Sequence, residues 1–503
     1  MQDPELSIYN TLSRTKERFS PRCEGEIRMY VCGPTVYDVS HVGHARKEVV
    51  FDVIARYLRY LGFRLQYVRN ITDVDDKIIA RANGEGAPCA EIARRYEAAF
   101  QEDMDALGTI HPDHEPRATE TIPEMLDLIQ ELLIKELAYT SSGSVYFSVG
   151  RWESYGRLSR RKLEEMLAGA RVELDTAKRD PLDFALWKAS KPGEPCWPSP
   201  WGEGRPGWHI ECSAMSRKFL GETLDIHGGG VDLVFPHHEN EIAQSEAATG
   251  KPFCRWWVHN GLLTVNREKM SKSLGNFITV REALRKFHPE VLRMFFLSHQ
   301  YRSPVDFSDE AVGATRRNLD YFYNTLLRID EVCGKQAEEP VGTDCEREAR
   351  NLLGEMQTEF SDPLANLRQR FCGALSDDFN TADALGELFR AATFLNKWMD
   401  GGGSVRIEQG KSVLSSFRRQ LGETGQVLGL FQEEPLRWFR QGYAAGSAGD
   451  VLCDERIEER LHAREAARKA KDWKTADRIR TDLAFQGILI EDTPQGTRWK
   501  RRN

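Results

Sequence analysis

The pattern of apolar and polar positions near the N-terminus predicts a strand, a helix and a second strand. Residues 27–31 and 63–68 are short apolar runs rich in β-forming side chains. Residues 45–62, between them, carry apolar side chains at helical spacing and end in glycine. This succession predicts an α/β fold built on a parallel sheet with helices on its faces.

The same kind of pattern continues after a long interruption. Residues 87–137 are predicted to be mostly helical, whereas residues 138–205 are predicted to be irregular and polar. A strand that runs into a glycine turn is expected at 223–230, between two helices. We therefore interpret the irregular segment as an insertion between two halves of one sheet domain. After residue 280 the pattern is helical, with a flexible loop predicted at 401–412.

Composition places the chain in a reducing compartment. Its ten cysteines are scattered and form no CxxC pair, which is not typical of a disulfide framework. No stretch approaches the ~18 apolar residues of a membrane helix. The first 19 residues do not resemble a signal peptide. We expect a cytoplasmic protein.

The C-terminal segment differs in charge from the rest of the chain. Residues 455–503 contain 13 Lys/Arg and 9 Asp/Glu, a net charge of +4 in a chain whose formal net charge is −8. One interpretation is a solvated basic helix and tail. The other is a small RNA-contacting module, because binding phosphates requires clustered Lys and Arg.

A His-x-Gly-His sequence lies at the first predicted strand-to-helix turn. At such a turn, backbone N–H groups and the helix dipole favour the binding of a phosphate group. Gly43 would let a ligand approach the backbone, and His41 and His44 could donate hydrogen bonds to phosphate oxygens. The alternative is a chance tetrapeptide or a local helix cap.

A lysine-bearing loop, "EKMSKSLGN", spans residues 268–276. Lys269 and Lys272 lie three residues apart among small side chains, so the loop could close over a triphosphate. A solvated loop is the alternative. The combination of His-x-Gly-His with a downstream Lys-Met-Ser-Lys-Ser resembles the two-part signature of class I aminoacyl-tRNA synthetases.

Four residues are candidate metal ligands. Cys32 ends the first predicted strand, at the edge where open α/β sheets bind ligands. His237 and Glu241 are four residues apart and share a helix face, and Cys212 lies in a further helix. Two thiolates, an imidazole and a carboxylate suit zinc, with His238 as a rival for the imidazole. Each residue taken singly could instead belong to the core.

With these motifs the chain resembles the cysteinyl-tRNA synthetase family. The likeness runs from "LSIYNTLSRTKE" to "DWKTADRIRTDL" and so covers nearly the whole chain. The matching stretches are "YVCGPTVYDVSHVGHARKEVVFDVIARYL", "RNITDVDDKII", "GWHIECSAM", "DIHGGGVDLVFPHHENEIAQSEA" and "NREKMSKSLGNF".

The resemblance implies an α/β, Rossmann-like catalytic domain with an insertion, followed by a helical bundle and a small C-terminal module. The implied domains are a catalytic domain at 1–130 and 206–250, a connective insertion at 131–205, a loop and stem-contact region at 251–318, a helical bundle tRNA-binding domain at 319–430 and an anticodon-binding module at 431–503. The segment 331–365 is longer and more polar than we expect for the family, and its role stays open.

The resemblance also assigns residues. The implied ligands of one Zn²⁺ per chain are Cys32, Cys212, His237 and Glu241. The implied lining of the cysteine pocket is Gly33, Thr72 and Trp208. The implied catalytic and ATP-binding residues are His41, His44, Lys269 and Lys272. In the first motif, Val42 replaces the commoner isoleucine.

The function implied is ATP- and Mg²⁺-dependent ligation of L-cysteine to tRNA(Cys), through a cysteinyl-adenylate, by a monomer. Two alternatives are a paralogous ligase that joins cysteine to an amino sugar and a zinc-stabilised RNA-binding protein without catalysis. The long helical region and the basic C-terminus disfavour the first. The intact lysine loop disfavours the second.

Overall fold

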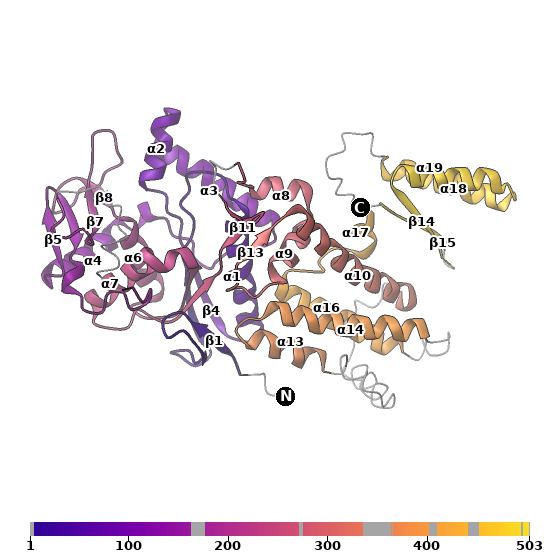
Figure 1. Cartoon of the computed structure of the whole chain (residues 1–503), viewed down its shortest axis with the longest axis horizontal. Helices are drawn as coiled ribbons and strands as arrows, with labels where there is room; N and C mark the ends of the chain where they lie inside the picture. Colours follow the sequence, from indigo (N-terminus) through magenta and orange to yellow (C-terminus); the bar gives the residue numbers. More distant parts are fainter. Residues whose placement is uncertain are drawn as a thin grey trace. The chain divides into compact units, whose positions relative to one another are not determined.

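Figure 1 shows a computed structural model of the chain, which divides into two compact units. The first comprises Met1–Val280, Phe296–Ser308 and Gln369–Gly386, and the second comprises Arg281–Phe295, Asp309–Arg368 and Glu387–Asn503. The structure describes residues 5–161, 177–270, 275–334, 364, 366–401, 410–440, 452–493 and 496–501. Within those ranges, no helix is both long enough and apolar enough to cross a membrane.

A parallel four-stranded sheet organises the first unit, which confirms the predicted α/β class. Its order is β10 (Cys254–Asn260), β9 (Leu224–Gly230), β3 (Glu26–Val31) and β4 (Arg64–Arg69). Helix α1 (Val42–Tyr60) connects β3 to β4, as its apolar spacing predicted. Because all four strands run the same way, their carboxyl ends meet at one edge.

The chain between β4 and β9 is more ordered than the sequence suggested. The prediction that 138–205 is irregular is wrong, because this stretch contributes an antiparallel four-stranded sheet. Its strands, in order, are β5 (Ala138–Ser141), β6 (Ser144–Phe147), β7 (Phe184–Ala189) and β8 (Gly204–Pro206). Three of the four have only three or four residues, too few for a clear alternation. The proline- and glycine-rich stretch supplies only the edge strand β8, since proline cannot donate to a central ladder.

Further helices complete the first unit. They are α2 (Asp76–Glu85), α3 (Cys89–Ala106), α4 (Ile122–Ile134), α6 (Trp208–Leu220) and α7 (Glu239–Thr249). Helix α6 packs on β3 and β4, and α4 packs on both α6 and α7. The hydrophobic core of this part includes Trp187 and Trp257, both fully buried.

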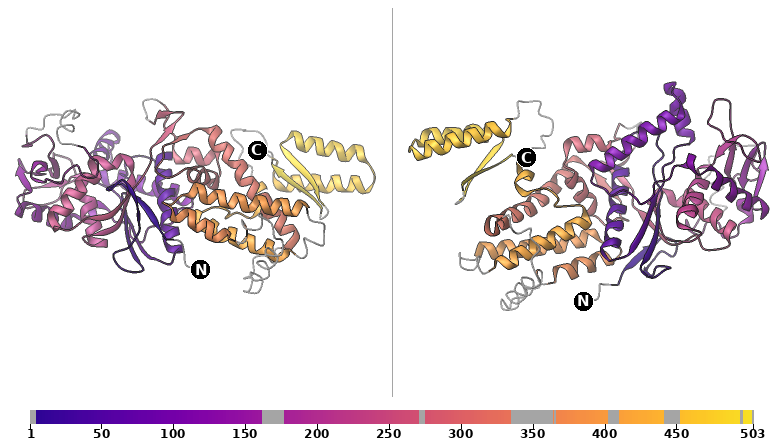
Figure 2. Two further views of the ribbon diagram at one scale, coloured as in Figure 1. Left: turned by 60° about the horizontal axis from the view of Figure 1, so that its bottom comes forward. Right: turned by 180° about the vertical axis from the view of Figure 1, so that it is seen from behind.

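The second unit is largely helical, as predicted for the chain after residue 280. Its helices include α10 (Asp309–Cys333), α16 (Lys411–Leu428), α17 (Pro435–Arg440) and most of α14 (Thr381–Gly401). Figure 2 shows α10, α14 and α16 lying side by side. Helix α17 belongs to this packing, because Trp438 stacks on Tyr323 of α10 with ring centroids 4.3 Å apart.

The C-terminal residues form a small module with a core of its own. It consists of α18 (Asp454–Lys469), α19 (Trp473–Phe485) and a hairpin of β14 (Ile488–Thr493) and β15 (Gly496–Arg501). The core residues are Ile457, Leu461, Leu483, Ile488, Ile490 and Trp499. The hairpin and the separate core disfavour the interpretation of this segment as a solvated basic helix and tail.

Asp378 joins three separate stretches of the first unit. The residue is fully buried, and its backbone N–H donates to the Ser7 carbonyl at 2.8 Å. One carboxylate oxygen accepts from the Tyr9 N–H at 2.8 Å and from the Tyr301 hydroxyl at 2.9 Å. The other oxygen accepts from two guanidinium nitrogens of Arg302 at 2.8 and 2.7 Å. The carboxylate therefore ties the N-terminal strand to residues 300–302.

We expect Asp378→Asn to destabilise the first unit by about 2–4 kcal/mol, because it breaks a buried, multiply hydrogen-bonded ion pair. Denaturant unfolding, followed by circular dichroism, measures this. The control is Asp377→Asn, since the Asp377 side chain is 58% exposed and pairs only with Lys16 on the surface. That variant should change stability by less than about 0.5 kcal/mol. Equal effects of the two substitutions would contradict the assigned role of Asp378.

Candidate active site and metal centre

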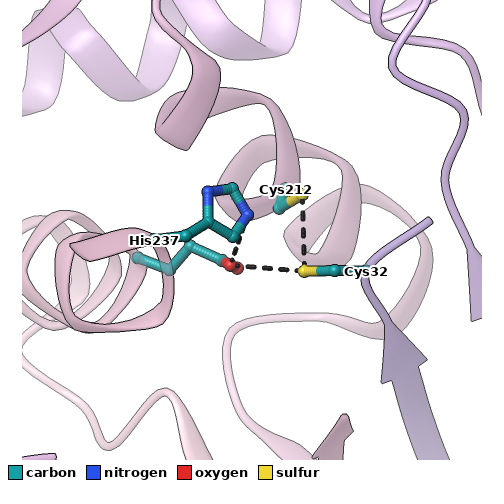
Figure 3. Close-up of side chains that lie close together, drawn as sticks. Cys32, Cys212 and His237 are labelled. Atoms are coloured by element: carbon teal, nitrogen blue, oxygen red, sulfur yellow. Dashed lines mark hydrogen bonds and ion pairs between the residues drawn. The ribbon is translucent and has the colours of Figure 1, made fainter. Parts of the chain in front are cut away.

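The four predicted metal ligands come together at the carboxyl edge of the parallel sheet (Figure 3). Cys32 follows β3, Cys212 lies in α6, His237 lies in the turn η4 (Val234–His238) and Glu241 lies in α7. All four are buried, and one ligand atom from each lies within 4.8 Å of the others. The sequence motifs therefore converge on one cluster.

The dimensions of this cluster fit a tetrahedral zinc ion. Two sulfurs bound to zinc at ~2.3 Å lie about 3.8 Å apart, and a sulfur and a carboxylate oxygen lie about 3.6 Å apart. The Sγ atoms of Cys32 and Cys212 are 3.8 Å apart, and Cys32 Sγ is 3.5 Å from Glu241 Oε1. His237 Nε2 and Glu241 Oε1, at 3.0 Å, lie closer together than two ligands of one zinc ion would.

The electrostatics of the cluster favour a cation. Burial would raise the pKa of Glu241, but the charges of His227 and His237 lower it to about 2. Burial would lower the pKa of His237, but Glu241 and Cys212 raise it to about 10. The pKa of Cys212 is lowered to about 6, since the hydrogen bond with Cys32 and the charge of His237 outweigh the effect of burial. This anionic cluster attracts positive charge, which a divalent metal would supply.

Tyr30 lies next to the two sulfurs of the cluster. The side chain is fully buried, and its hydroxyl lies close to Cys212. Burial raises the pKa of Tyr30 well above its usual value, and the neighbouring Cys212 and Cys32 raise it further. A neutral phenol beside these sulfurs is a suitable hydrogen-bond donor to a thiolate.

Further histidines lie around the cluster, and of these the sequence analysis named only His238, as a rival for the imidazole. His227 Nε2 is 2.9 Å from Glu241 Oε2, and His238 Nε2 is 3.3 Å from Cys32 Sγ. His238 Nδ1 in turn lies 2.7 Å from His259 Nε2. A second possible ligand set is Cys32, His227, His238 and Glu241. The structure thus brings both His237 and His238 to the cluster, but only the set with His237 contains both thiols.

The signal for two of these histidines was present in the sequence. His227 and His259 lie in β9 and β10, within four residues of the carboxyl ends of these strands. A polar residue that close to the end of a buried parallel strand points to the ligand-binding edge.

The predicted cysteine pocket is organised by Asn70, which the sequence analysis did not single out. The Asn70 Oδ1 atom accepts from the Gly33 N–H at 2.8 Å, and its Nδ2 donates to Thr72 Oγ1 at 3.2 Å. Gly33 is required by packing, since a Cβ there would lie 1.6 Å from the Asn70 carbonyl oxygen. Trp208 stacks on His237 with ring centroids 4.3 Å apart, which links the pocket to the metal cluster.

His41 and His44 lie at the N-terminus of α1, where His41 is the N-cap residue. Their rings stack with centroids 3.8 Å apart, and His41 Nδ1 accepts from the Gly43 N–H at 3.1 Å. A Cβ on Gly43 would lie 2.9 Å from the His41 ring, so the lack of a side chain at this position makes room for His41. Burial lowers the pKa of His41 to about 4 and also lowers that of His44, so both rings are neutral at neutral pH.

The His-x-Gly-His turn lies against the segments that flank the lysine loop. The Val42 N–H donates to the Ile278 carbonyl at 3.1 Å, and the Val280 N–H donates to the Ser40 carbonyl at 2.9 Å. Lys269 is exposed on the short strand β12 (Glu268–Lys269), whereas Lys272 lies outside the described residues. The two motifs, distant in sequence, are therefore neighbours in space.

Comparison with known proteins agrees with this geometry. A family model described as "tRNA synthetases class I (C) catalytic domain" matches residues 18–317. A DALR domain model matches residues 370–432, and a model described as "Cysteinyl-tRNA ligase anticodon binding domain" matches residues 452–499.

Curated relatives match along almost the whole chain. A cysteine–tRNA ligase of Syntrophobacter fumaroxidans is 51% identical over 496 residues, which cover 98% of this chain and 99% of that protein. The corresponding ligase of Geobacter metallireducens is 53% identical, with the same coverage of both chains.

Solved structures share the fold at low identity. Mycobacterium tuberculosis methionyl-tRNA synthetase in complex with methionyl-adenylate has a TM-score of 0.58 at 17% identity, covering 80% of this chain and 90% of that one. A ternary complex of Agrobacterium radiobacter K84 LeuRS has a TM-score of 0.57 at 12% identity, covering 85% and 86%. On the family models and the curated relatives together, the chain belongs to the cysteine–tRNA ligase family of class I aminoacyl-tRNA synthetases.

Proposed function

We propose that this chain activates L-cysteine with ATP and Mg²⁺ and transfers it to tRNA(Cys), and that its buried cluster binds one zinc ion that recognises the substrate thiol. Family membership supplies the ligase activity. The observation that carries the metal assignment is the convergence of Cys32, Cys212, His237 and Glu241 at the carboxyl edge of the sheet. We also propose that the enzyme acts as a monomer in the cytoplasm.

In this proposal the cysteine carboxylate attacks the α-phosphate of ATP and pyrophosphate leaves. A ribose hydroxyl at the tRNA 3′ end then attacks the carbonyl carbon of the adenylate, and AMP leaves. His41 and His44, as neutral rings, would donate hydrogen bonds to phosphate oxygens, and Lys269 and Lys272 would offset the triphosphate charge. The side chains form no covalent intermediate, so catalysis depends on positioning and charge stabilisation.

The proposed ligands suit a thiol better than an alcohol. A zinc ion bound there would supply a soft Lewis-acidic centre that takes a thiolate readily. Cys32, Cys212 and Glu241 would place three negative charges around the two positive charges of the zinc ion. Such a zinc centre is a weak Lewis acid and would not ionise the hydroxyl group of serine. A free thiol, with a pKa of about 8.5, needs much less help. This difference supports discrimination without an editing domain, since shape alone separates such near-isosteres poorly.

His227 bears on whether the site can accept a substrate. Four protein ligands usually form a closed structural site. An ionised Glu241 can only accept hydrogen bonds, so His227 Nε2 donates to its Oε2 at 2.9 Å. Only Oε1 is then turned toward the sulfurs. Holding the carboxylate to one oxygen favours leaving a coordination position for the substrate.

Metal replacement tests the recognition of the thiol. Enzyme that contains cobalt in place of zinc should gain a thiolate-to-metal absorption band when cysteine is added, and serine should cause no change. Cys212→Ala should lose about one equivalent of metal per chain. The control is Cys254→Ala, because Cys254 is also buried but lies outside both ligand sets. If cysteine leaves the cobalt spectrum unchanged, the metal does not bind the substrate thiol and its role is structural.

The lysine loop yields a second prediction. Lys272→Ala should lower kcat for cysteine-dependent ATP–pyrophosphate exchange by roughly a hundredfold, the effect of removing one preorganised donor from a transition state. The KM for cysteine should change much less, because the lysine contacts the triphosphate. Lys251→Ala removes an exposed lysine that pairs with Glu222 and serves as the control. Unaltered exchange kinetics in Lys272→Ala would exclude this role.

A third prediction concerns the C-terminal module. Since residues 457–499 contain a separate core, a chain that ends at residue 451 should remain folded. Its exchange rate with cysteine should stay within about twofold of the full chain, whereas charging of tRNA(Cys) should fall by roughly tenfold or more through weaker binding. Circular dichroism verifies folding. Loss of exchange in a folded truncated chain would show that the module also serves the first step.

A further inference from the structure

We propose that Glu211 makes the cysteine pocket selective for thiols that carry an α-ammonium group, so that two separate groups of the substrate are recognised. The inference deepens the proposed function and rests on it. Glu211 lies in α6, directly before Cys212, and is only 1% exposed. Its Oε2 accepts a hydrogen bond from Thr72 Oγ1 at 3.1 Å.

Among the described residues, the Glu211 carboxyl group pairs with no Lys, Arg or His, and the Thr72 hydroxyl is its only hydrogen-bond partner. Burial and the negative charges of Cys212, Asp75 and Asp73 raise the pKa of Glu211 well above its usual value, so ionising this carboxyl group is unfavourable without a cation beside it. Burying a carboxylate in such surroundings is costly unless a positive group compensates it. A bound ammonium ion would provide that compensation.

The hydrogen-bond directions fix Thr72 as an acceptor for any ligand. Its hydroxyl has one proton, and that proton is donated to Glu211. One lone pair accepts from Asn70 Nδ2 at 3.2 Å. The remaining capacity of Thr72 Oγ1 is therefore a lone pair. The neighbouring Gly33 N–H is also committed, because it donates to Asn70 Oδ1 at 2.8 Å. The Thr72 hydroxyl can therefore accept a hydrogen bond from a ligand, but neither Thr72 nor Gly33 has a proton left to donate.

The acceptor groups of Glu211 and Thr72 lie beside the proposed thiol site. Asn70, which holds Thr72, has its Oδ1 atom 3.7 Å from Cys212 Sγ. Glu211 and Cys212 are consecutive residues of one helix, so their positions are coupled. In cysteine the sulfur and the ammonium nitrogen are separated by two carbons, a spacing that lets one molecule contact both places. The chemical class that satisfies both is a 2-aminothiol.

The test uses the zinc-containing enzyme and two small inhibitors of cysteine-dependent ATP–pyrophosphate exchange. Cysteamine keeps the thiol and the ammonium group, whereas 3-mercaptopropionate keeps the thiol and has no ammonium group. For the unaltered enzyme, the inhibition constant of cysteamine should be lower by about tenfold or more, the scale of one hydrogen bond to a charged group. In Glu211→Gln this ratio should fall towards one, and the KM for cysteine should rise about tenfold with a smaller change in kcat.

Three further variants separate recognition from folding. Glu131→Gln removes the same charge from a carboxylate that pairs with Arg217 of α6 at 2.9 Å, and it should keep the inhibitor ratio of the unaltered enzyme. Thr72→Val should lower the ratio, and Thr72→Ser, which retains the hydroxyl, should restore it. A ratio that is unchanged in Glu211→Gln, or an equal weakening of both inhibitors, would overturn the proposal.

The failure of this inference can be distinguished from failure of the proposed function. If the enzyme activates cysteine but not serine and Glu211→Gln leaves the inhibitor ratio intact, only the role of Glu211 is wrong. If the unaltered enzyme binds serine as well as cysteine, thiol recognition itself is wrong, whatever Glu211 does.

Discussion

The arrangement of the catalytic unit depends on one buried carboxylate, Glu241. Its Oε1 atom contacts Cys32, at the end of β3, and His237, in the turn before α7. Its Oε2 atom is hydrogen-bonded to His227 of strand β9. Burial raises the pKa of such a group, yet the charges of these histidines lower it to about 2. A buried anion of this kind must be compensated by neighbouring groups or by a metal. The contacts that compensate it hold segments from three parts of the chain together.

The parallel sheet places the residues of the candidate site next to one another. Each of its four strands brings a polar residue to the same edge: Cys32 after β3, Asn70 after β4, His227 in β9 and His259 in β10. Helix α6 then adds Glu211 and Cys212 to this edge. The metal-ligand cluster and Thr72 are consequently close to each other, with Asn70 in contact with both. The α1 N-terminus, with the two stacked histidines, lies in the same unit.

Much of the fold was predictable because local patterns are strong there. The βαβ unit of 27–68 and the long helices carry regular apolar spacing, and the structure confirms them. The insertion sheet was missed because three of its four strands have only three or four residues, and because β6 pairs with β7 from much further along the chain. The C-terminal hairpin pairs locally, and it was missed because charged side chains interrupt the apolar pattern of its strands. At Gly43 the space that a side chain would occupy is filled by the ring of His41 from the same turn, a contact that the sequence analysis did not anticipate. The assigned roles of the site residues, Lys272 among them, stay predictions.

The sequence by itself determined the fold class, the family and the residue types of the candidate site, because these depend on motifs short enough to read along the chain. Tertiary structure decided what those residues do to one another. It brought His227 to Glu241, turned the Thr72 proton toward Glu211 and placed Asn70 between Gly33 and Thr72. The direction of a hydrogen bond and the cost of burying a charge arise only when distant segments meet, so no linear pattern records them.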